Sequence, residues 1–325
     1  MIREISFIKA VREAFQEEMR RDQNVIVIGE DVRAGIFATT SGLVNEFGKK
    51  RVLNTPICES TFIGVGVGAA MANLRPIVQI MFSDFLYMAM EMVANQAGQW
   101  HYLSDGKLKV PMVIEAPSGA RGGAGYGHSQ SIEASFMYPP GLKVVVPSNP
   151  YDAKGLFKSA VRDDNPVLFF EHRHLLTMKG KVPEEEYLIP LGKAKVYREG
   201  SDCTVVAVGR MVHEANDAAY ILSKDGINIE IIDPRTLVPL DEETIFQSLK
   251  KTCHLVIVEE GRKRSGFGAE LGALAAEKWF EYLDAPIKRV AAPSLPIPYS
   301  PKLEKAIIPD SHSIAEAIRK TLIGE

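Results

Sequence analysis

Short runs of hydrophobic residues recur along this chain and alternate with longer segments whose apolar residues have helical spacing. The runs predict buried strands at residues 25–28, 77–82, 110–115, 143–146, 167–170, 204–208, 227–232 and 255–258. The helical spacing predicts helices at 7–19, 87–100, 151–162, 214–223 and 268–279, after Asp241 and from Ser313. Continuous apolar strands alternating with helices are typical of mainly parallel sheets covered by helices, so we expect an α/β fold.

The alternation is interrupted between residues 172 and 192. This segment contains Pro183, three consecutive glutamates at 184–186 and Pro190, and we interpret it as a linker or a surface excursion. Because the alternation resumes after it, we predict two α/β domains, residues 1–185 and 186–325, each with a mainly parallel sheet. A length of 325 residues is sufficient for two domains.

The composition is that of a globular protein without a large basic surface. Hydrophobic residues make up 46% and charged residues 24% of the chain, and the formal net charge is −3. No block of Lys or Arg predicts nucleic-acid binding, and no apolar run reaches the roughly 18 residues of a membrane span. The N-terminus lacks a signal-peptide pattern, and three widely spaced cysteines indicate free thiols in a reducing compartment. We therefore expect a cytoplasmic protein.

Glu59 is the most informative single residue. It lies in a polar loop, residues 55–60, and is followed by small and apolar residues at 61–70 that we expect to be buried. A carboxyl group carried into apolar surroundings retains its proton more readily and can act as an acid or base near neutral pH. The alternative is a solvated loop charge, and the choice between the two decides the function.

Residues 64–69 match the dinucleotide-binding pattern G-x-G-x-x-A. That pattern requires a strand directly before the glycines, whereas here the polar residues 58–61 precede them. We favour a helix whose small residues pack closely on another helix. A nucleotide-binding oxidoreductase is the alternative.

Polar and aromatic residues follow several predicted strands. Glu30 follows the first strand, residues 82–85 close the second, and an irregular loop at 116–131 follows the third. Ligands of parallel sheets bind beyond the carboxyl ends of the strands, so these segments are expected at one edge. The loop has five glycines before His128, a candidate acid or base, and an aromatic side chain in 82–85 is suited to stack on a flat ligand.

Several motifs stand in an order that resembles the β subunit of the thiamine-diphosphate-dependent 2-oxo acid dehydrogenases, which include the pyruvate, branched-chain and acetoin types. The motifs span residues 55–59, 82–85, 128–131, 140–147, 152–156, 165–166 and 266–270, so the resemblance covers nearly the whole chain. It implies a pyrimidine-binding domain followed by a transketolase-like C-terminal domain. It also implies an oxidoreductase that acts on an aldehyde or oxo group with a disulfide acceptor.

The resemblance implies roles for individual residues. Glu59 would hydrogen-bond N1′ of the cofactor's aminopyrimidine and favour the imino tautomer, whose N4′ removes the proton from C2 of the thiazolium ring. The carbonyl of Ile57 would accept from the 4′-amino group, and Phe85 would lie against the pyrimidine ring. His128 would serve proton transfer to the substrate or a lipoyl group, and Glu30 would line the same cleft.

The resemblance also implies partners and ions. Two α and two β chains would form a heterotetramer with thiamine diphosphate between them, the α subunit bringing the Mg²⁺ and diphosphate site. The acyl product would pass to lipoyl groups of a transacylase core. Backbone oxygens would bind a structural potassium ion at Met112, Ala160, Val161, Asp163 and Asn165.

The sequence leaves the small-molecule substrate open between pyruvate, a branched-chain 2-oxo acid and acetoin. One alternative is the C-terminal half of a split transketolase that acts on sugar phosphates. A non-catalytic scaffold is another.

Overall fold

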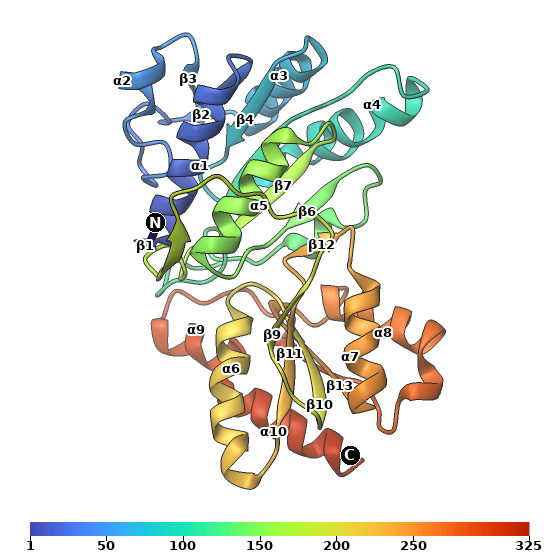
Figure 1. Cartoon of the computed structure of the whole chain (residues 1–325). Helices are drawn as coiled ribbons and strands as arrows, with labels where there is room; N and C mark the ends of the chain where they lie inside the picture. Colours follow the sequence, from blue (N-terminus) through green and yellow to red (C-terminus); the bar gives the residue numbers. More distant parts are fainter. Residues whose placement is uncertain (325) are drawn as a thin grey trace. The chain divides into compact units, whose positions relative to one another are not determined.

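The computed structural model describes residues 1–324, which form two compact units (Figure 1). The first unit consists of Met1–Ser118 and Phe136–Leu191, and the second consists of Gly119–Ser135 and the described residues from Gly192 onward. The predicted division between residues 185 and 186 stays a prediction. Each unit is described here by itself.

The first unit contains a parallel sheet in which the strands follow the order β6-β7-β5-β4-β2-β3. Each of these pairs runs parallel, as the continuous apolar runs predicted. The strands are β2 (Val25–Glu30), β3 (Val52–Thr55), β4 (Arg75–Gln79), β5 (Val113–Ser118), β6 (Lys143–Val145) and β7 (Val167–His172).

Helices cover this sheet, and their apolar sides fill the core. They are α1 (Phe7–Arg21), α2 (Leu43–Phe47), α3 (Glu59–Met71), α4 (Gly98–Leu103) and α5 (Pro150–Arg162). Ser6 caps α1 by accepting a 3.3 Å hydrogen bond from the Lys9 amide, so this predicted helix start is confirmed. The single helix predicted near 87–100 is instead three pieces: the 3₁₀ segment η1 (Ser83–Ala89), the π-helical η2 (Met92–Ala97) and α4. Apolar spacing does not report such local changes of helix type.

The segment interpreted as a linker is part of the first unit. It contains β8 (Lys179–Pro183), which pairs antiparallel with β1 (Ile2–Ser6). Beyond β8, the Tyr187 ring stacks on Tyr151 of α5 with centroids 4.5 Å apart. The only apolar aliphatic side chain in β8, Val182, is fully buried, and one such residue among lysines gives no strand pattern to the sequence.

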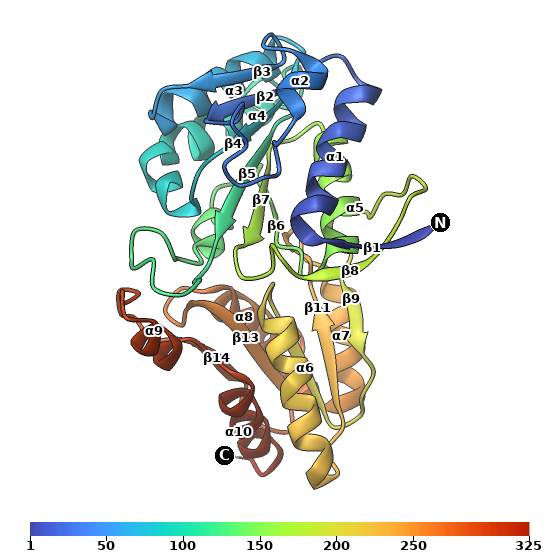
Figure 2. The same cartoon turned by 90° about the vertical axis from the view of Figure 1, so that its left-hand side faces the viewer.

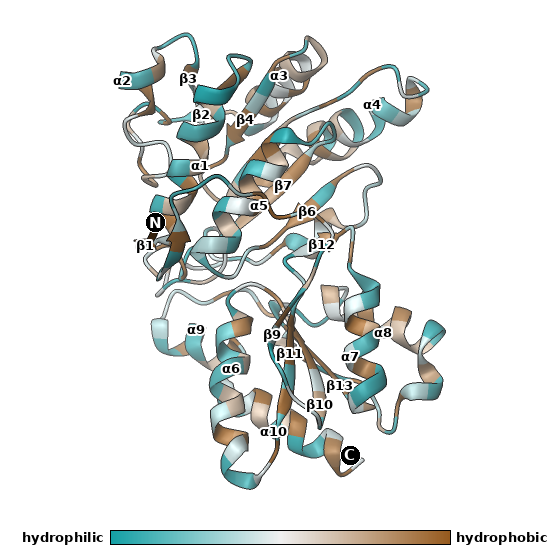
Figure 3. Ribbon diagram, viewed as in Figure 1, coloured by the Kyte–Doolittle hydropathy of each residue, from teal (hydrophilic) through white to brown (hydrophobic). Residues whose placement is uncertain are grey.

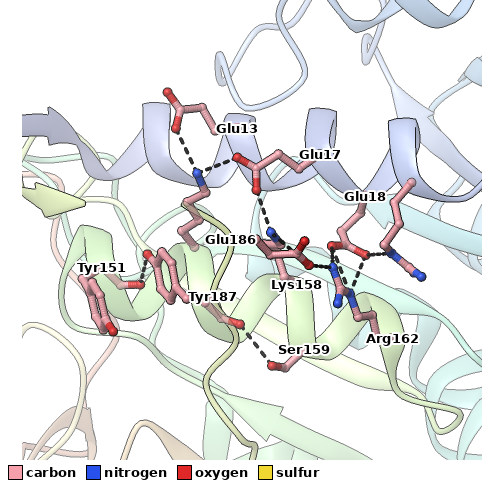
Figure 4. Close-up of polar contacts among 12 residues, drawn as sticks. Glu13, Glu17, Glu18, Tyr151, Lys158, Ser159, Arg162, Glu186 and Tyr187 are labelled. Atoms are coloured by element: carbon pink, nitrogen blue, oxygen red, sulfur yellow. Dashed lines mark hydrogen bonds and ion pairs between the residues drawn. The ribbon is translucent and has the colours of Figure 1, made fainter. Parts of the chain in front are cut away.

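Charged side chains join α1 to α5, which lie side by side (Figures 1 and 2). Figure 4 shows Lys158 beside Glu17 and Arg162 beside Glu18. Lys158 Nζ lies 2.7 Å from Glu17 Oε2, and Lys154 Nζ lies 2.6 Å from Glu17 Oε1. Arg162 donates to both carboxylate oxygens of Glu18, with Nη2 2.6 Å from Oε1. Each of these buried charges therefore faces an opposite charge.

The second unit contains a sheet in the order β14-β13-β10-β11-β9, in which only the β11–β9 pair is antiparallel. The strands are β9 (Lys195–Arg198), β10 (Cys203–Ala207), β11 (Ile229–Asp233), β13 (Leu255–Arg262) and β14 (Lys288–Ala292), and β12 (Thr236–Val238) is a short further strand. The sequence pattern missed β9 and β14, whose residues are mostly half-buried or exposed.

Helices α6 (Met211–Leu222) and α10 (Ser311–Leu322) pack against each other and on the sheet of the second unit (Figure 2). The others are α7 (Glu242–Thr252), α8 (Phe267–Lys278) and α9 (Pro301–Ile307), with short 3₁₀ turns at Glu133–Phe136, Ser223–Asp225 and Phe280–Tyr282. Asp241 caps α7 as predicted, whereas the cap of α10 is Asp310 rather than a residue near Ser313.

Figure 3 shows the strands of both sheets as predominantly hydrophobic and the outer helix faces as polar. This distribution agrees with the α/β prediction, because a sheet covered on both faces needs apolar residues at every strand position. Among residues 1–324, no helix combines the length and the hydropathy that crossing a bilayer requires.

Candidate functional site

Two of the predicted site residues of the first unit, Glu30 and Glu59, lie at or just beyond the carboxyl ends of β2 and β3. Glu30 is the last residue of β2 and lies in register opposite Thr55, the last residue of β3. Helix α3 begins at Glu59, four positions after β3 ends. Parallel strands place their carboxyl ends at one edge of the sheet, where ligands of open α/β sheets bind.

Glu59 is not a solvated loop charge. It is the first residue of α3, with Cys58 at the N-cap, and only 5% of it is exposed. A carboxylate in the first turn is stabilised by the partial positive charge of the unpaired helix amides. Within residues 1–324 the structure gives the Glu59 carboxyl group no hydrogen-bond donor. A buried polar group without a protein partner is suited to bind a ligand atom.

Glu30 and Glu59 are brought together by the fold. Burial raises the pKa of Glu30, and the nearby carboxyl groups of Asp31 and Glu59 raise it further. Two acidic groups that influence each other at a sheet edge are typical of sites where a proton is held or exchanged. The sequence predicted both residues for one cleft.

Phe85 is half-buried and stands at the end of a row of aromatic rings. Its ring meets Phe82 edge to face at 5.8 Å, and Phe82 meets Phe37 in the same way at 5.4 Å. The Arg173 guanidinium lies 4.9 Å from the Phe82 ring centre. The sequence analysis missed Phe37 and Arg173, because both are on segments without a recognisable motif.

The glycines of residues 64–69 are inside α3 and do not form a dinucleotide-binding turn. A Cβ added at Gly66 would lie 2.6 Å from Val78 of β4, and one added at Gly64 would lie 3.1 Å from the sulfur of Met92. Gly64 therefore allows the close packing on another helix that was favoured from the sequence, whereas Gly66 allows close packing on a strand of the sheet. On the outer side Val65 is 54% exposed, and Ile57, just before the helix, is 73% exposed.

His128 belongs to the second unit. It lies in a segment without regular structure and is half-buried, and its backbone N–H donates to the carbonyl of Gly125 at 3.2 Å. The prediction of an irregular glycine-rich loop is confirmed, although its start is Gly119 rather than residue 116 because β5 continues to Ser118.

Arg75 occupies part of the predicted potassium position. Its Nη1 donates to the carbonyls of Val161 at 3.0 Å and Asp163 at 2.9 Å. The carbonyls of Met112 and Ala160 accept backbone hydrogen bonds at 2.9 and 3.2 Å. A carbonyl has two lone pairs, so each keeps capacity for a second partner. A cation bound here would share its ligands with a guanidinium.

The carboxyl group of Asp163 is also held by its neighbours. Lys143 Nζ lies 2.5 Å from Oδ2, and the Asn165 backbone and side-chain amides donate to Oδ1 at 2.9 and 3.0 Å. Although burial opposes the effect, these contacts hold the pKa of Asp163 below its ordinary value. In the part of the chain that the structure describes, no cluster of three or more His, Cys, Asp or Glu side chains is placed to hold a metal ion.

Two buried carboxyl groups that the sequence analysis did not single out lie on adjacent strands. Glu115 of β5 lies opposite Gln79 of β4, and its carboxyl Oε2 accepts from Gln79 Nε2 at 2.6 Å. Burial raises the pKa of Glu115 to about 7, and hydrogen bonds from Gln79, Thr39 and Glu171 moderate the rise. Burial and the neighbouring Glu115 raise the pKa of Glu171 well above its ordinary value. The signal in the sequence was a glutamate at the end of one apolar run and another directly after a second run.

Comparison with protein families and curated proteins assigns both parts of the chain. Residues 3–179 match the transketolase pyrimidine-binding domain, and residues 192–314 match the transketolase C-terminal domain. The chain is 46% identical to the β subunit of acetoin:2,6-dichlorophenolindophenol oxidoreductase of Bacillus subtilis, with 100% of this chain and 99% of that protein covered. It is 45% identical to the 2-oxoisovalerate dehydrogenase β subunit of the same organism, with coverages of 97% and 98%.

A third relative is named for a different substrate and has nearly the same identity. The pyruvate dehydrogenase E1 β subunit of Rickettsia bellii is 44% identical, with 98% of each chain covered. Among solved structures, a split-gene transketolase in an inactive β4 tetramer has a TM-score of 0.81 at 22% identity, over 98% of this chain and 99% of that chain. That likeness shows the fold.

Both matched domains are of the transketolase type, and the identities extend over almost the full length of each relative. The resemblance stated from the sequence is therefore confirmed. The chain belongs to the transketolase-like family of dehydrogenase β subunits, which includes the β subunits of acetoin, 2-oxoisovalerate and pyruvate dehydrogenases.

Proposed function

We propose that this chain is the β subunit of a thiamine-diphosphate-dependent dehydrogenase that acts on a 2-oxo acid or on acetoin and transfers the acyl product to a lipoyl group. The observation that supports this most directly is the buried carboxyl group of Glu59, which has no donor within residues 1–324. It stands beside a second acidic group at the ligand-binding edge of a parallel sheet.

The residues of the first unit fit the pyrimidine half of the cofactor. Glu59 would hold a proton at N1′ of the aminopyrimidine, and the carbonyl of Ile57 would accept from the 4′-amino group. The half-buried ring of Phe85 would lie against the pyrimidine, and Glu30 would keep a second proton-exchanging group in the same cleft. When bound, thiamine diphosphate supplies a nucleophilic carbon and an electron sink for cleaving the bond next to a carbonyl group.

The other half of the site would come from partners. An α subunit would supply the Mg²⁺ and diphosphate site in an α2β2 assembly, and the exposed side chains of Ile57 and Val65 beside α3 are suited to such a contact. His128 would transfer protons to the substrate or to a lipoyl group. The second unit would help to dock the transacylase core.

A potassium ion would use the carbonyls around Asp163 together with Arg75. Because the carbonyl groups of Met112, Ala160, Val161 and Asp163 already accept hydrogen bonds, we expect binding to be weak and its effect on stability to be small. A melting temperature that rises with KCl but not with equal LiCl would support the site, and identical curves would contradict it.

The test is co-expression with a candidate α subunit and a screen of pyruvate, branched-chain 2-oxo acids and acetoin with an artificial electron acceptor. Thiamine-dependent turnover of one of them is the expected result. The same screen contains sugar phosphates, because their turnover would instead identify a transketolase. Absence of thiamine-dependent turnover with all of them would overturn the proposal.

Substitution of Glu59 tests its role directly. Glu59→Gln keeps the size of the side chain but removes the exchangeable proton, so proton exchange at C2 of the bound cofactor should slow by about 10²-fold or more. The exchange rate is measured by deuterium incorporation, and sedimentation checks that the assembly is intact. Glu4→Gln, on the exposed side of β1, is the matched control and should exchange at the wild-type rate. Wild-type exchange in Glu59→Gln would rule out the assigned role.

A further inference from the structure

We propose that Glu304 and Glu260 are positioning residues that hold residues 119–131, hereafter the His128 loop, in its working conformation. The relevance to catalysis rests on the proposed function, because it assumes that His128 transfers protons there. The structural part of the inference depends only on contacts inside the second unit.

The His128 loop has little internal support. It contains no helix or strand. Within it, the Gly119 amide donates to the Gln130 carbonyl at 3.1 Å and the His128 amide donates to the Gly125 carbonyl at 3.2 Å. Gly122, Gly123 and Gly125 have φ angles of 73°, 94° and 74°. Glycine-rich segments lose much conformational entropy on ordering, so a single conformation needs contacts from outside the loop.

Glu304 supplies two of these contacts. Its Oε1 accepts from the Gly122 amide at 2.7 Å, and its Oε2 accepts from the Gly123 amide at 2.9 Å. The residue lies in α9 and is only 6% exposed. Hydrogen bonds to an ionised carboxylate are roughly twice as strong as neutral ones, and here both oxygens grip successive amides.

Glu260 holds the two ends of the loop. Its Oε1 accepts from the Ala120 amide at 2.8 Å and from the Ser131 hydroxyl at 3.1 Å. Arg210 Nη1 lies 3.6 Å from the other oxygen and balances the charge. The preceding residue of β13, Glu259, accepts hydrogen bonds from amides at the start of α8 instead. Successive side chains of a strand point to opposite faces, so these two adjacent carboxyl groups bind different segments.

Tyr299 packs directly against Gly123 and Gly125 of the loop. A Cβ added at Gly125 would lie 2.3 Å from the Tyr299 ring, and one added at Gly123 would lie 2.6 Å from the Tyr299 carbonyl. Tyr126 meets the same ring edge to face at 6.2 Å. The absence of side chains at Gly123 and Gly125 therefore lets the His128 loop approach Tyr299 closely. In this position the amides of Gly122 and Gly123 are within reach of Glu304.

Limited proteolysis with trypsin tests the hydrogen bonds of Glu304 to the His128 loop, hereafter the Glu304 clamp, without an activity assay. Arg121 is exposed, and the bond that trypsin would cut joins it to Gly122, whose amide Glu304 holds. Glu304→Ala should raise the rate of cleavage at Arg121 by about ten-fold or more relative to other sites, because cleavage requires local opening. Glu304→Gln keeps one acceptor and should fall between Glu304→Ala and wild type.

The matched control is Glu316→Ala on α10, whose carboxylate is exposed and contacts Lys320. It should cleave at Arg121 at the wild-type rate. Fragment masses identify the site, and a melting curve shows whether each variant is folded. If Glu304→Ala does not fold, the cleavage rate of Glu304→Gln is used instead. A wild-type rate of cleavage at Arg121 in a folded Glu304 variant would overturn the proposal that Glu304 holds the loop.

The catalytic part is measured in the assembled enzyme. Glu304→Ala should lower kcat for lipoyl-dependent turnover while leaving the Kd for thiamine diphosphate unchanged, and Glu304→Gln should restore part of kcat. Unchanged kcat in a variant with a loosened loop would overturn the positioning role. If the wild-type assembly has no thiamine-dependent turnover, the proposed function fails, whereas the protease result still reports on the clamp.

Discussion

The first unit buries carboxyl groups in two places. In one place they face positively charged side chains, and in the other they face each other. Between α1 and α5, the fully buried Glu18 faces Arg162, and the fully buried Lys154 faces Glu17 (Figure 4). On β5 and β7, Glu115 and Glu171 are just as buried but face each other. Each of these two retains an Oε1 atom with no hydrogen-bond partner in the described structure.

The difference shows how the same residue type takes two roles. A buried charge that faces an opposite charge is compensated by it, so the α1–α5 contacts join two helices and each depends on its partner. Two buried carboxyl groups that face each other cannot both ionise at low cost, so they retain protons. The first arrangement should depend on the presence of each partner, and the second on pH.

The largest effect is expected from removing a cation between α1 and α5. Lys154→Met preserves the length of the side chain but leaves Glu13 with Arg3 and Glu17 with Lys158 as their remaining cations, and should destabilise the unit by about 3 kcal/mol. Urea unfolding measures the loss. Lys109→Met is the control, because its pair with Asp164 is exposed and worth at most about 0.5 kcal/mol. Equal losses of unfolding free energy in Lys154→Met and Lys109→Met would contradict the distinction between buried and exposed ion pairs.

A smaller and pH-dependent effect is expected at the acid pair. Because the folded pKa of Glu115 is raised to about 7 and that of Glu171 lies above its ordinary value, the folded chain binds more protons than the unfolded one. The stability that these protons provide is complete below about pH 4.5 and is lost as pH rises through about 7, at about 1.4 kcal/mol per proton and pH unit.

Glu171→Gln should remove most of this loss. The introduced amide donates to Glu115 as a protonated Glu171 does, without titrating. We expect little change at pH 5 and a gain of about 2 kcal/mol over wild type at pH 8, measured by urea unfolding at both values. A difference that does not change with pH would show that the pair is not protonated as proposed, and Glu4→Gln supplies the baseline.

Local sequence predicted much of the first unit's site. Glu59 is flanked by residues whose own pattern specifies a buried helix, and Glu30 directly ends an apolar run, so both were placed from their neighbours. Phe37 and Arg173 were missed because their contacts with Phe82 join segments far apart in the chain. The strand β8 was missed because its pairing with β1 depends on backbone hydrogen bonds rather than on apolar alternation.

The sequence by itself determined the alternation of strands and helices, the family and the burial of the segment that follows Glu59, whereas the structure showed that Glu59 is itself the first residue of α3. These depend on residues within a few positions of one another, where periodicity and motif order are informative. Only the tertiary structure showed that Glu304 grips amides 182 positions earlier, and that Glu115 meets Glu171. Such contacts depend on how distant segments pack, and a carboxyl group carries no local mark of the partner that decides its protonation.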